Sequence, residues 1–441
     1  MIRSMFTAIS SLSLQQKYLD VVSNNLANAN TTGFKASRVL AQDQFAQMMS
    51  PGSAPSTTQG GTNPTQVGLG VSLGYISSNF TQGILQSTGR NMDLGVQGDG
   101  FFIYGQNANR RYSREGSMSL DMDGNLVNSA TGLRTQGWLT DAAGVTDTNL
   151  PVGDIKIVTD KTLAKATESV VLGGNLSANA TVGDTNTISM GVYDSLGALQ
   201  TTAVRFTRGG TPAVPAVIAD PTATPPVVGS PAVAAIPNNT WTWQIMDTSG
   251  ATPVLGTGDG TITFDASGQI DVALSVPGTA VGIPGSAGST DPINPLAIDF
   301  SKLTQLASAN TATVTSQDGL PAGTVSDVYI SPNNGVISLV YSNGMAEQVG
   351  QVALARFTNP AGLVKGEDTT FLAGLNSGDP QIGAASTGGR GAISSSFLEA
   401  SNVDMAQEFT NMILAQRGFQ ASSRVITTSD EILQELVNLK R

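Results

Sequence analysis

The chain contains no cysteine and no histidine among its 441 residues. Without cysteine, neither disulfides nor thiolate metal sites can form. Without histidine, the chain lacks the commonest general base and the commonest metal ligand. The usual hydrolase triads are therefore excluded. Ser-Lys and paired-carboxylate chemistry stay open, but no particular pair is marked. We expect a protein that is not an enzyme, with no catalytic, cofactor-binding or metal site and no cofactor.

Charge is also scarce. Charged residues make up 12% of the chain, against about 25% in ordinary soluble domains. The net charge is −11, and no run of Lys or Arg offers a local exception. A phosphate backbone would be repelled, so nucleic acid is not expected as a partner. A surface of small, uncharged polar residues can instead pack against copies of itself without desolvating many charges.

Long hydrophobic runs are absent as well. No stretch approaches the ~18 apolar residues of a membrane span, so membrane insertion is not expected. The N-terminus does not have the pattern of a cleavable signal, because Ser10, Ser11, Ser13 and Gln15 interrupt any apolar segment of sufficient length. An exported protein with this N-terminus would need a route that leaves the N-terminus intact.

Both ends of the chain have helical periodicity. Apolar residues recur there at alternating spacings of three and four, the pattern of a coiled-coil seam. The predicted N-terminal helix covers residues 2–26, and the predicted C-terminal helix is capped by Ser401 or Asn402. The seam comprises Ile2, Met5, Ile9, Leu12, Leu19, Leu26, Met405, Phe409, Met412, Phe419, Ile426, Leu433 and Val437. One such helix could lie on a globular core, but two at opposite ends favour pairing of the termini.

The middle of the chain has β signals. Asn343-Gly344 and Asn334-Gly335 predict tight turns between strands in residues 327–357, because both positions of such a turn need positive φ. Asp123-Gly124 predicts another hairpin; it lacks the spacing of a calcium loop. Further strands are expected at residues 188–193, 203–206, 240–245 and 261–264. Residues 50–70 and 208–238 are rich in Pro, Gly and small residues and are expected to be poorly packed.

Several motifs resemble those of flagellar rod, hook and hook-associated proteins. The N-terminal signature comprises Asn24, Asn25, Ala27, Asn28, Thr32, Gly33, Phe34 and Lys35, and the C-terminal one comprises Glu399, Ala400, Ser401, Asn402, Val403, Asp404, Gln416 and Arg417. Between them, Thr81-Gln82-Gly83, Gly98-Asp99-Gly100-Phe101-Phe102 and Tyr112-Ser113-Arg114-Glu115-Gly116 resemble a β segment of hook and distal-rod proteins. The motifs occur in the order of the family.

The resemblance implies a mainly β fold with α-helical termini. The N- and C-terminal helices would pair as a coiled coil, with nested β domains inserted between them. The expected parts are an inner helical domain of residues 1–40 and 396–441, and a linker or extended segment of residues 41–75. An inner β domain would comprise residues 76–150 and 318–395, and an inserted outer β domain residues 151–317.

The resemblance also implies a function. The chain would be a structural subunit of the hook, which self-assembles into a curved, hollow tube and acts as a universal joint between motor and filament. Its partners would be copies of itself, the distal rod protein, the hook cap, the hook-filament junction proteins and the flagellar export apparatus. It would be extracellular and exported without a cleaved signal peptide.

Alternatives remain open. They are a distal-rod protein with an enlarged insertion, an oligomeric cell-surface β adhesin and, third, a polysaccharide-cleaving enzyme. In the hook interpretation, the uncharged polar residues Gln15, Asn24, Asn25, Asn28 and Gln416 are candidates to face the bore of the tube. They are equally suited to be caps and solvated positions.

Overall fold

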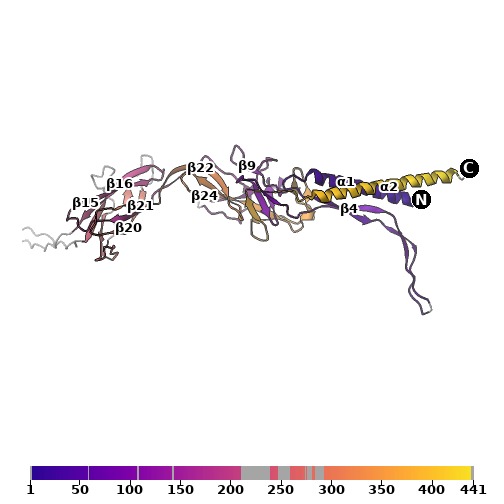
Figure 1. Ribbon diagram of the computed structural model, residues 1–441, viewed down its shortest axis with the longest axis horizontal. Coiled ribbons are helices and arrows are strands. Elements are labelled where there is room, and N and C mark those ends of the chain that lie inside the picture. The colour runs from indigo at the N-terminus through magenta and orange to yellow at the C-terminus, as the bar shows by residue number, and fades with distance from the viewer. Residues whose placement is uncertain are drawn as a thin grey trace, which may run out of the picture. The chain divides into compact units, whose positions relative to one another are not determined.

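The computed structural model describes residues 2–57, 59–106, 109–141, 144–209, 239–246, 259–273, 275, 281–283 and 293–438. The chain divides into two compact units (Figure 1). Unit 1 comprises Met1–Thr159, Asp327–Val340 and Ala346–Arg441, and unit 2 comprises Asp160–Ser326 and Tyr341–Met345. Most of the proline-rich stretch at 208–238, which was expected to be poorly packed, lies outside the described residues.

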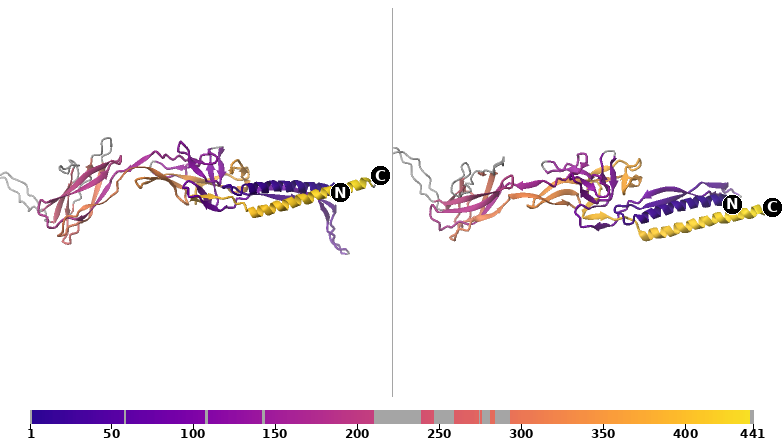
Figure 2. Two further views of the ribbon diagram at one scale, coloured as in Figure 1. Left: turned by 45° about the horizontal axis from the view of Figure 1, so that its top comes forward. Right: turned by 90° about the horizontal axis from the view of Figure 1, so that it is seen from above.

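The two ends of the chain form a helix pair in unit 1. Helix α1 (Ile2–Ala27) and helix α2 (Met405–Asn438) are the terminal helices that the periodicity predicted. They lie side by side in every view, with the two termini at the same end (Figure 2). Among the described residues, no helix is long and apolar enough to cross a membrane.

Helix α2 begins later than predicted. Asp404 caps it, because its Oδ1 accepts hydrogen bonds from the backbone N–H groups of Ala406 (2.9 Å) and Gln407 (3.1 Å). The prediction that Ser401 or Asn402 would be the cap is therefore wrong. Ser401 Oγ accepts from the N–H of Val403, and the Asn402 side chain is bonded to residues far away in the sequence. A side chain engaged elsewhere cannot satisfy the first N–H groups of the helix.

An antiparallel ribbon follows α1. Strands β1 (Ser37–Asp43) and β4 (Val71–Ser78) pair at its base, and β2 (Ala46–Ser50) and β3 (Thr65–Gly68) pair beyond them. All side chains of β2 and β3 are exposed. Residues 50–70 thus lack a core of their own, as their composition predicted, but the backbone hydrogen bonds of the ribbon extend along part of them.

Strands from both sides of the insertion build the β sheet of unit 1. Its central path runs β23-β24-β7-β8-β26-β25, and β11 and β27 also pair with β24. The strands on the path are β7 (Phe101–Tyr104), β8 (Arg111–Ser113), β23 (Val336–Tyr341), β24 (Ala346–Arg356), β25 (Val364–Lys365) and β26 (Thr370–Leu372). The strands that extend it are β11 (Gln136–Leu139), β12 (Gly153–Asp154), which pairs with β11, and β27 (Gln381–Ala384). The predicted strands of residues 327–357 are confirmed, and a turn lies at Asn343-Gly344. The expectation that both turn residues have positive φ is wrong, because only Gly344 does (φ +84°).

Short strand pairs and an aromatic core complete unit 1. The pairs are β5 (Leu85–Ser87) with β29 (Phe397–Glu399), β6 (Leu94–Gln97) with β28 (Ala392–Ser395), and the predicted hairpin β9 (Met118–Leu120) with β10 (Leu126–Asn128). Phe101, Tyr112, Phe357 and Phe371 pack edge to face in the core, with ring centroids 4.8–6.1 Å apart. Residues from the two halves of the chain therefore share one core.

Unit 2 is a β structure with its own core. One sheet has the antiparallel order β15-β16-β17-β18, and the other has the order β19-β20-β14-β21, in which β14 and β20 are parallel. The strands of these sheets are β14 (Ser169–Asn175), β15 (Thr185–Tyr193), β16 (Leu199–Arg208), β17 (Thr240–Met246), β18 (Asp259–Thr263), β19 (Val281–Ile283), β20 (Ile293–Thr304) and β21 (Thr313–Gln317). Outside these sheets, β13 (Thr162–Lys165) pairs with β22 (Leu320–Ile330), whose last four residues belong to unit 1. One hydrophobic cluster includes Leu172 and Leu303 from the second sheet and Phe206 and Trp241 from the first. The two sheets therefore pack against each other, and the four strands predicted here are confirmed.

Candidate assembly site

The helix pair is antiparallel and closely packed. Ser11 Oγ lies 2.9 Å from Ser422 Oγ, and Gly418 faces Gln15 so closely that a Cβ would come within 2.8 Å of Gln15 Nε2. Gln15 lies four residues after Ser11 in α1, whereas Gly418 lies four residues before Ser422 in α2. The two helices therefore run antiparallel. Small residues at the contact allow this approach, because each removes side-chain volume between the helix axes.

The contact uses half of the predicted seam. Every second predicted position lies half-buried on the facing sides, namely Met5, Leu12, Leu19 and Leu26 in α1 and Met412, Phe419, Ile426 and Leu433 in α2. At the intervening positions of the predicted seam, the residue in the helix contact is the one that precedes the predicted residue. Ala8, Gln15 and Val22 lie there instead of Ile9, Gln16 and Ser23, and Ala415, Ser422 and Ser429 instead of Gln416, Ser423 and Asp430. Small residues on α2 take the positions of closest approach.

The other predicted seam residues lie outside the helix pair. Ile9, Met405, Phe409 and Val437 are exposed in the single chain, and the side chain of Ile2 lies outside the described part of the structure. Their assignment as contacts with other copies therefore stays a prediction. Glu408 is half-buried at the start of α2, and its Oε2 has no hydrogen-bond partner within the chain.

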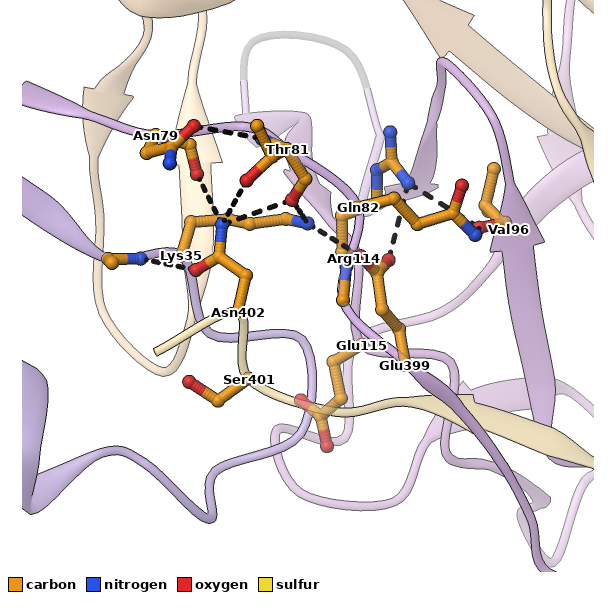
Figure 3. A network of polar contacts seen from close by, with 12 residues as sticks. Lys35, Asn79, Thr81, Gln82, Val96, Arg114, Glu115, Glu399, Ser401 and Asn402 are labelled. Atoms are coloured by element: carbon orange, nitrogen blue, oxygen red, sulfur yellow. Dashed lines mark hydrogen bonds and ion pairs between the residues drawn. The ribbon is translucent and has the colours of Figure 1, made fainter. Parts of the chain in front are cut away.

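The two family signatures meet in a buried network of charges (Figure 3). The Glu399 carboxylate accepts hydrogen bonds from Lys35 Nζ (2.6 Å), Arg114 Nη1 (3.2 Å) and the N–H of Gly83 (2.8 Å). The side chains of Lys35 and Glu399 are 0% exposed and that of Arg114 is 3% exposed. Lys35 Nζ also donates to the carbonyl of Thr81 at 2.8 Å. One carboxylate thus holds three separate segments of the chain.

Burial dominates the electrostatics of this network. It lowers the pKa values of the Lys35 amine and the Arg114 guanidinium, and the Glu399 carboxylate acts in the opposite direction on both. The second cation is stabilised by backbone carbonyls, since Arg114 Nη2 donates to the carbonyl of Gly98 at 2.8 Å. Removing the carboxylate would leave two buried cations without the counter-charge that they share.

Asn402 closes the network next to the start of α2. Its Nδ2 donates to the carbonyls of Asn79 (2.8 Å) and Thr81 (3.0 Å), and its Oδ1 accepts from the N–H of Ala36 at 2.8 Å. Figure 3 shows Asn402 beside Lys35 and Thr81. The network therefore fixes the segment after α1 and the segment before α2 onto the same part of unit 1.

The N-terminal signature also anchors the end of α1. Asn25 is buried and bonded to the backbone of Ser37 in both directions, with Nδ2 donating to its carbonyl (2.7 Å) and Oδ1 accepting from its N–H (2.9 Å). Asn28 Oδ1 accepts from Thr31 Oγ1 where the helix ends. Phe34 is buried beneath the ammonium of Lys365, which lies 4.3 Å from its ring centroid.

These contacts change the interpretation of the polar residues proposed for the bore. Gln15 lies against Gly418 of α2, Asn25 is bonded to the backbone of Ser37, and Asn28 is half-buried at the end of the helix. That these residues face or flank a bore stays a prediction. Asn24 and Gln416 are exposed. Of the other signature residues, Thr32, Ala400, Ser401 and Val403 are half-buried, and Ala27, Asp404 and Arg417 are exposed.

Sequence reasoning missed Arg114 and the small residues of the helix contact. Arg114 belongs to one of the family-like motifs, but its role as a partner of Glu399, 285 residues away, has no local signal. Ala415, Gly418 and Ser422 recur at spacings of three and four, and this was a signal of close helix packing. Among the described residues, no group of three or more acidic side chains could hold a metal ion.

Gly33, the glycine of the N-terminal signature, is expected to be sensitive to substitution. Its φ is +68°, and an added Cβ would lie 2.5 Å from the backbone N of Glu115. Gly33→Ala should therefore cost about 1–2 kcal/mol for the left-handed backbone and about 1–3 kcal/mol for the forced displacement. Gly89→Ala is the matched control, because Gly89 has φ +72° but no atom within 4 Å of its Cβ. Equal losses in chemical denaturation of the two variants would contradict the close approach.

Three family models match the chain. "Flagella basal body rod protein" matches residues 5–35, "Flagellar basal body protein FlaE D2 domain" matches residues 159–320, and "Flagellar basal body rod FlgEFG protein C-terminal" matches residues 394–439. The first and third cover both helices, and the second falls mainly on unit 2.

Two relatives align with the whole chain. The chain is 38% identical over 462 residues to the flagellar hook protein FlgE of Borreliella burgdorferi, and 36% identical over 490 residues to that of Treponema pallidum. Both alignments cover 100% of each chain. A crystal structure of Helicobacter pylori flagellar hook protein FlgE2 has a TM-score of 0.45 and 16% identity, covering 71% of this chain and 100% of that one.

Proposed function

Because the chain belongs to the flagellar hook protein family, we propose that its copies form a curved, hollow tube that transmits torque as a universal joint. It is a structural subunit of the hook and not an enzyme, and it polymerises with copies of itself. The alternatives, a distal-rod protein or a surface adhesin, are not favoured by these relatives.

The observation that carries the proposal is the helix pair at the ends of the chain. α1 packs against α2 and against strands β1 and β4, where Ser10 Oγ accepts from the N–H of Val71 at 3.3 Å. Even so, Phe409, Met405 and Ile9 remain exposed although they are large and apolar. Such residues on paired helices suit contacts with further helices in a polymer. We assign Ile2, Ile9, Met405, Phe409 and Val437 to these contacts.

The remaining assignments follow from the same proposal. The helix pair forms the inner part of each subunit, the sheet of unit 1 the middle part, and unit 2 the outer part. The partners in addition to further copies are the distal rod protein, the hook cap, the hook-filament junction proteins and the export apparatus. The chain is extracellular and reaches the hook without a cleaved signal peptide.

Electron microscopy of the polymer tests the proposal. Purified chain should form curved tubes with a central channel. Straight rods would favour a rod protein, and the absence of any regular polymer would favour the adhesin.

Deletion of residues 160–326, which form unit 2 except for Tyr341–Met345, should change the mechanics of the tube without preventing assembly. The register of Thr162 opposite Thr324 brings residues 160 and 326 close together, so a short Gly-Ser linker can replace residues 160–326. The helices and the core of unit 1 are left intact, and the contacts that the outer part makes between copies are removed. We expect tubes that are straighter or of altered stiffness in micrographs, and the full-length chain is the reference. Tubes of unchanged curvature and stiffness would show that unit 2 has no mechanical role.

A further inference from the structure

Helix α2 carries a second apolar stripe beside its contact with α1. Residues recur along it at spacings of four, three, four, three and four, namely Leu414, Gly418, Ala421, Val425, Thr428 and Ile432. Leu414 is 63% exposed, Val425 43% and Ile432 48%. Ala415, Ser422 and Ser429, which are buried in the helix pair, each follow a stripe residue by one position. One position is about 100° around a helix, so the stripe lies on the flank of the contact.

The large apolar residues of the stripe, Leu414, Val425 and Ile432, are left uncovered by their own chain. No charged residue lies on it, although Arg417, Arg424 and Glu431 occur at other positions over the same length of helix. The pairing of Ser11 with Ser422 places the first residues of α1 near residue 431. Ile432 and the residues after it therefore extend past α1. A stripe of this length in water would be stabilised only by a partner that covers it.

From this arrangement we propose that the stripe binds α1 of a second copy of this chain through the outward side chains of Phe6 and Ile9. The inference rests on the proposed function, in which copies polymerise. The alternating spacing fits a helix as the partner, and Gly418 and Ala421 allow close approach of its backbone. Continuity favours a helix of the same kind, because Gly418 already contacts Gln15 of its own α1.

Phe6 and Ile9 identify the partner helix. Among the described side chains of α1, they are the large hydrophobic residues that are exposed, at 61% and 48%. Three positions separate them, so they lie on the same side of the helix. Ala8 and Gln15 mark the side that faces the helix's own α2. Each α2 would thus contact two α1 helices, one from its own chain and one from a neighbour.

The absence of cysteine from the chain permits a direct test. Phe6→Cys is mixed in equal amounts with Leu414→Cys, Val425→Cys or Ile432→Cys, and each mixture is polymerised and oxidised. A disulfide needs Cα atoms about 4.4–6.8 Å apart, so covalent dimers should appear in at least one mixture. They should be absent from polymers of any single variant and from unpolymerised mixtures. Gln420→Cys, at an exposed position off the stripe, is the matched control and should give no dimer.

A second measurement applies if a cysteine variant assembles poorly. Val425→Asp should raise the critical concentration for polymerisation at least tenfold, and Gln420→Asp should leave it within twofold.

Three results would overturn the inference. The first is normal polymers without dimers in any mixture, and the second is equal critical concentrations for the two aspartate variants. The third is dimers in polymers of Leu414→Cys or Val425→Cys alone, which would show that the stripe pairs with another α2. Absence of polymer from the unaltered chain would refute the proposed function itself, and this outcome is distinct from the three.

Discussion

Glu399→Gln is expected to destabilise unit 1 by about 3–5 kcal/mol, the usual cost of removing one partner from a buried ion pair. The carboxylate accepts hydrogen bonds from Lys35, Arg114 and the backbone of Gly83, and the side chains of all three charged residues are at most 3% exposed. Glutamine has nearly the same shape but no charge. Lys35 and Arg114 would then stay buried without the carboxylate that they share.

Hydrogen exchange measured by mass spectrometry can locate this effect. Peptides from β6, β7 and β24 in unit 1 should exchange faster in the variant, whereas peptides from β15, β16 and β17 in unit 2 should not change. Glu367→Gln is the control, because Glu367 pairs with Arg111 at 3.6 Å while its own side chain is 83% exposed. An exposed pair contributes about 0–1 kcal/mol. Similar protection of unit 1 in the two variants would disprove the role of the network.

Leu19→Asp, or equally Leu12→Asp, is expected to abolish polymerisation while both β units stay folded. Each leucine is half-buried, and full burial of a leucine contributes about 1.5–3 kcal/mol. Aspartate loses the leucine's share of this contribution and adds the cost of partly desolvating a charge. Because each ~1.4 kcal/mol corresponds to a factor of ten in an equilibrium constant, the critical concentration should rise by at least a hundredfold.

Sedimentation of polymer at increasing protein concentration measures this loss. Gln420→Asp is the matched control, because it adds the same charge at an exposed position of the helix pair that lies off the stripe. Circular dichroism should show that the β signal and its melting are retained in each variant. Normal tubes from Leu19→Asp would show that the helix pair is not required for assembly.

The sequence determined the features that depend on neighbouring residues. The spacing of apolar residues is a local property, so both terminal helices and four of the shared seam positions in each were predictable. The Asn343-Gly344 and Asp123-Gly124 turns were predictable for the same reason, since their backbone angles favour glycine directly. The absence of histidine and cysteine excluded the common catalytic sites on composition alone, because no fold can supply a side chain that the chain does not contain.

The tertiary structure decided which of two neighbouring positions is buried. Ala8 faces α2 while Ile9 is exposed, and Ala415 faces α1 while Gln416 is exposed. Hydrophobicity in α1 favours Ile9, but the helices approach closely enough for Ser11 to contact Ser422, and such an approach favours small residues. Which of the two neighbouring residues is buried depends on how closely the helices pack, and the sequence of one helix alone does not determine this.

The same reason applies to the network and to the start of α2. Lys35 and Glu399 are 364 residues apart, and only the shared core of unit 1 brings them to 2.6 Å. Asn402 has the composition of a helix cap, but tertiary contacts with Asn79, Thr81 and Ala36 engage its side chain, so Asp404 caps the helix instead. Local propensity makes several residues suitable as the helix cap. Long-range hydrogen bonds decide which of them has its side chain free to cap the helix.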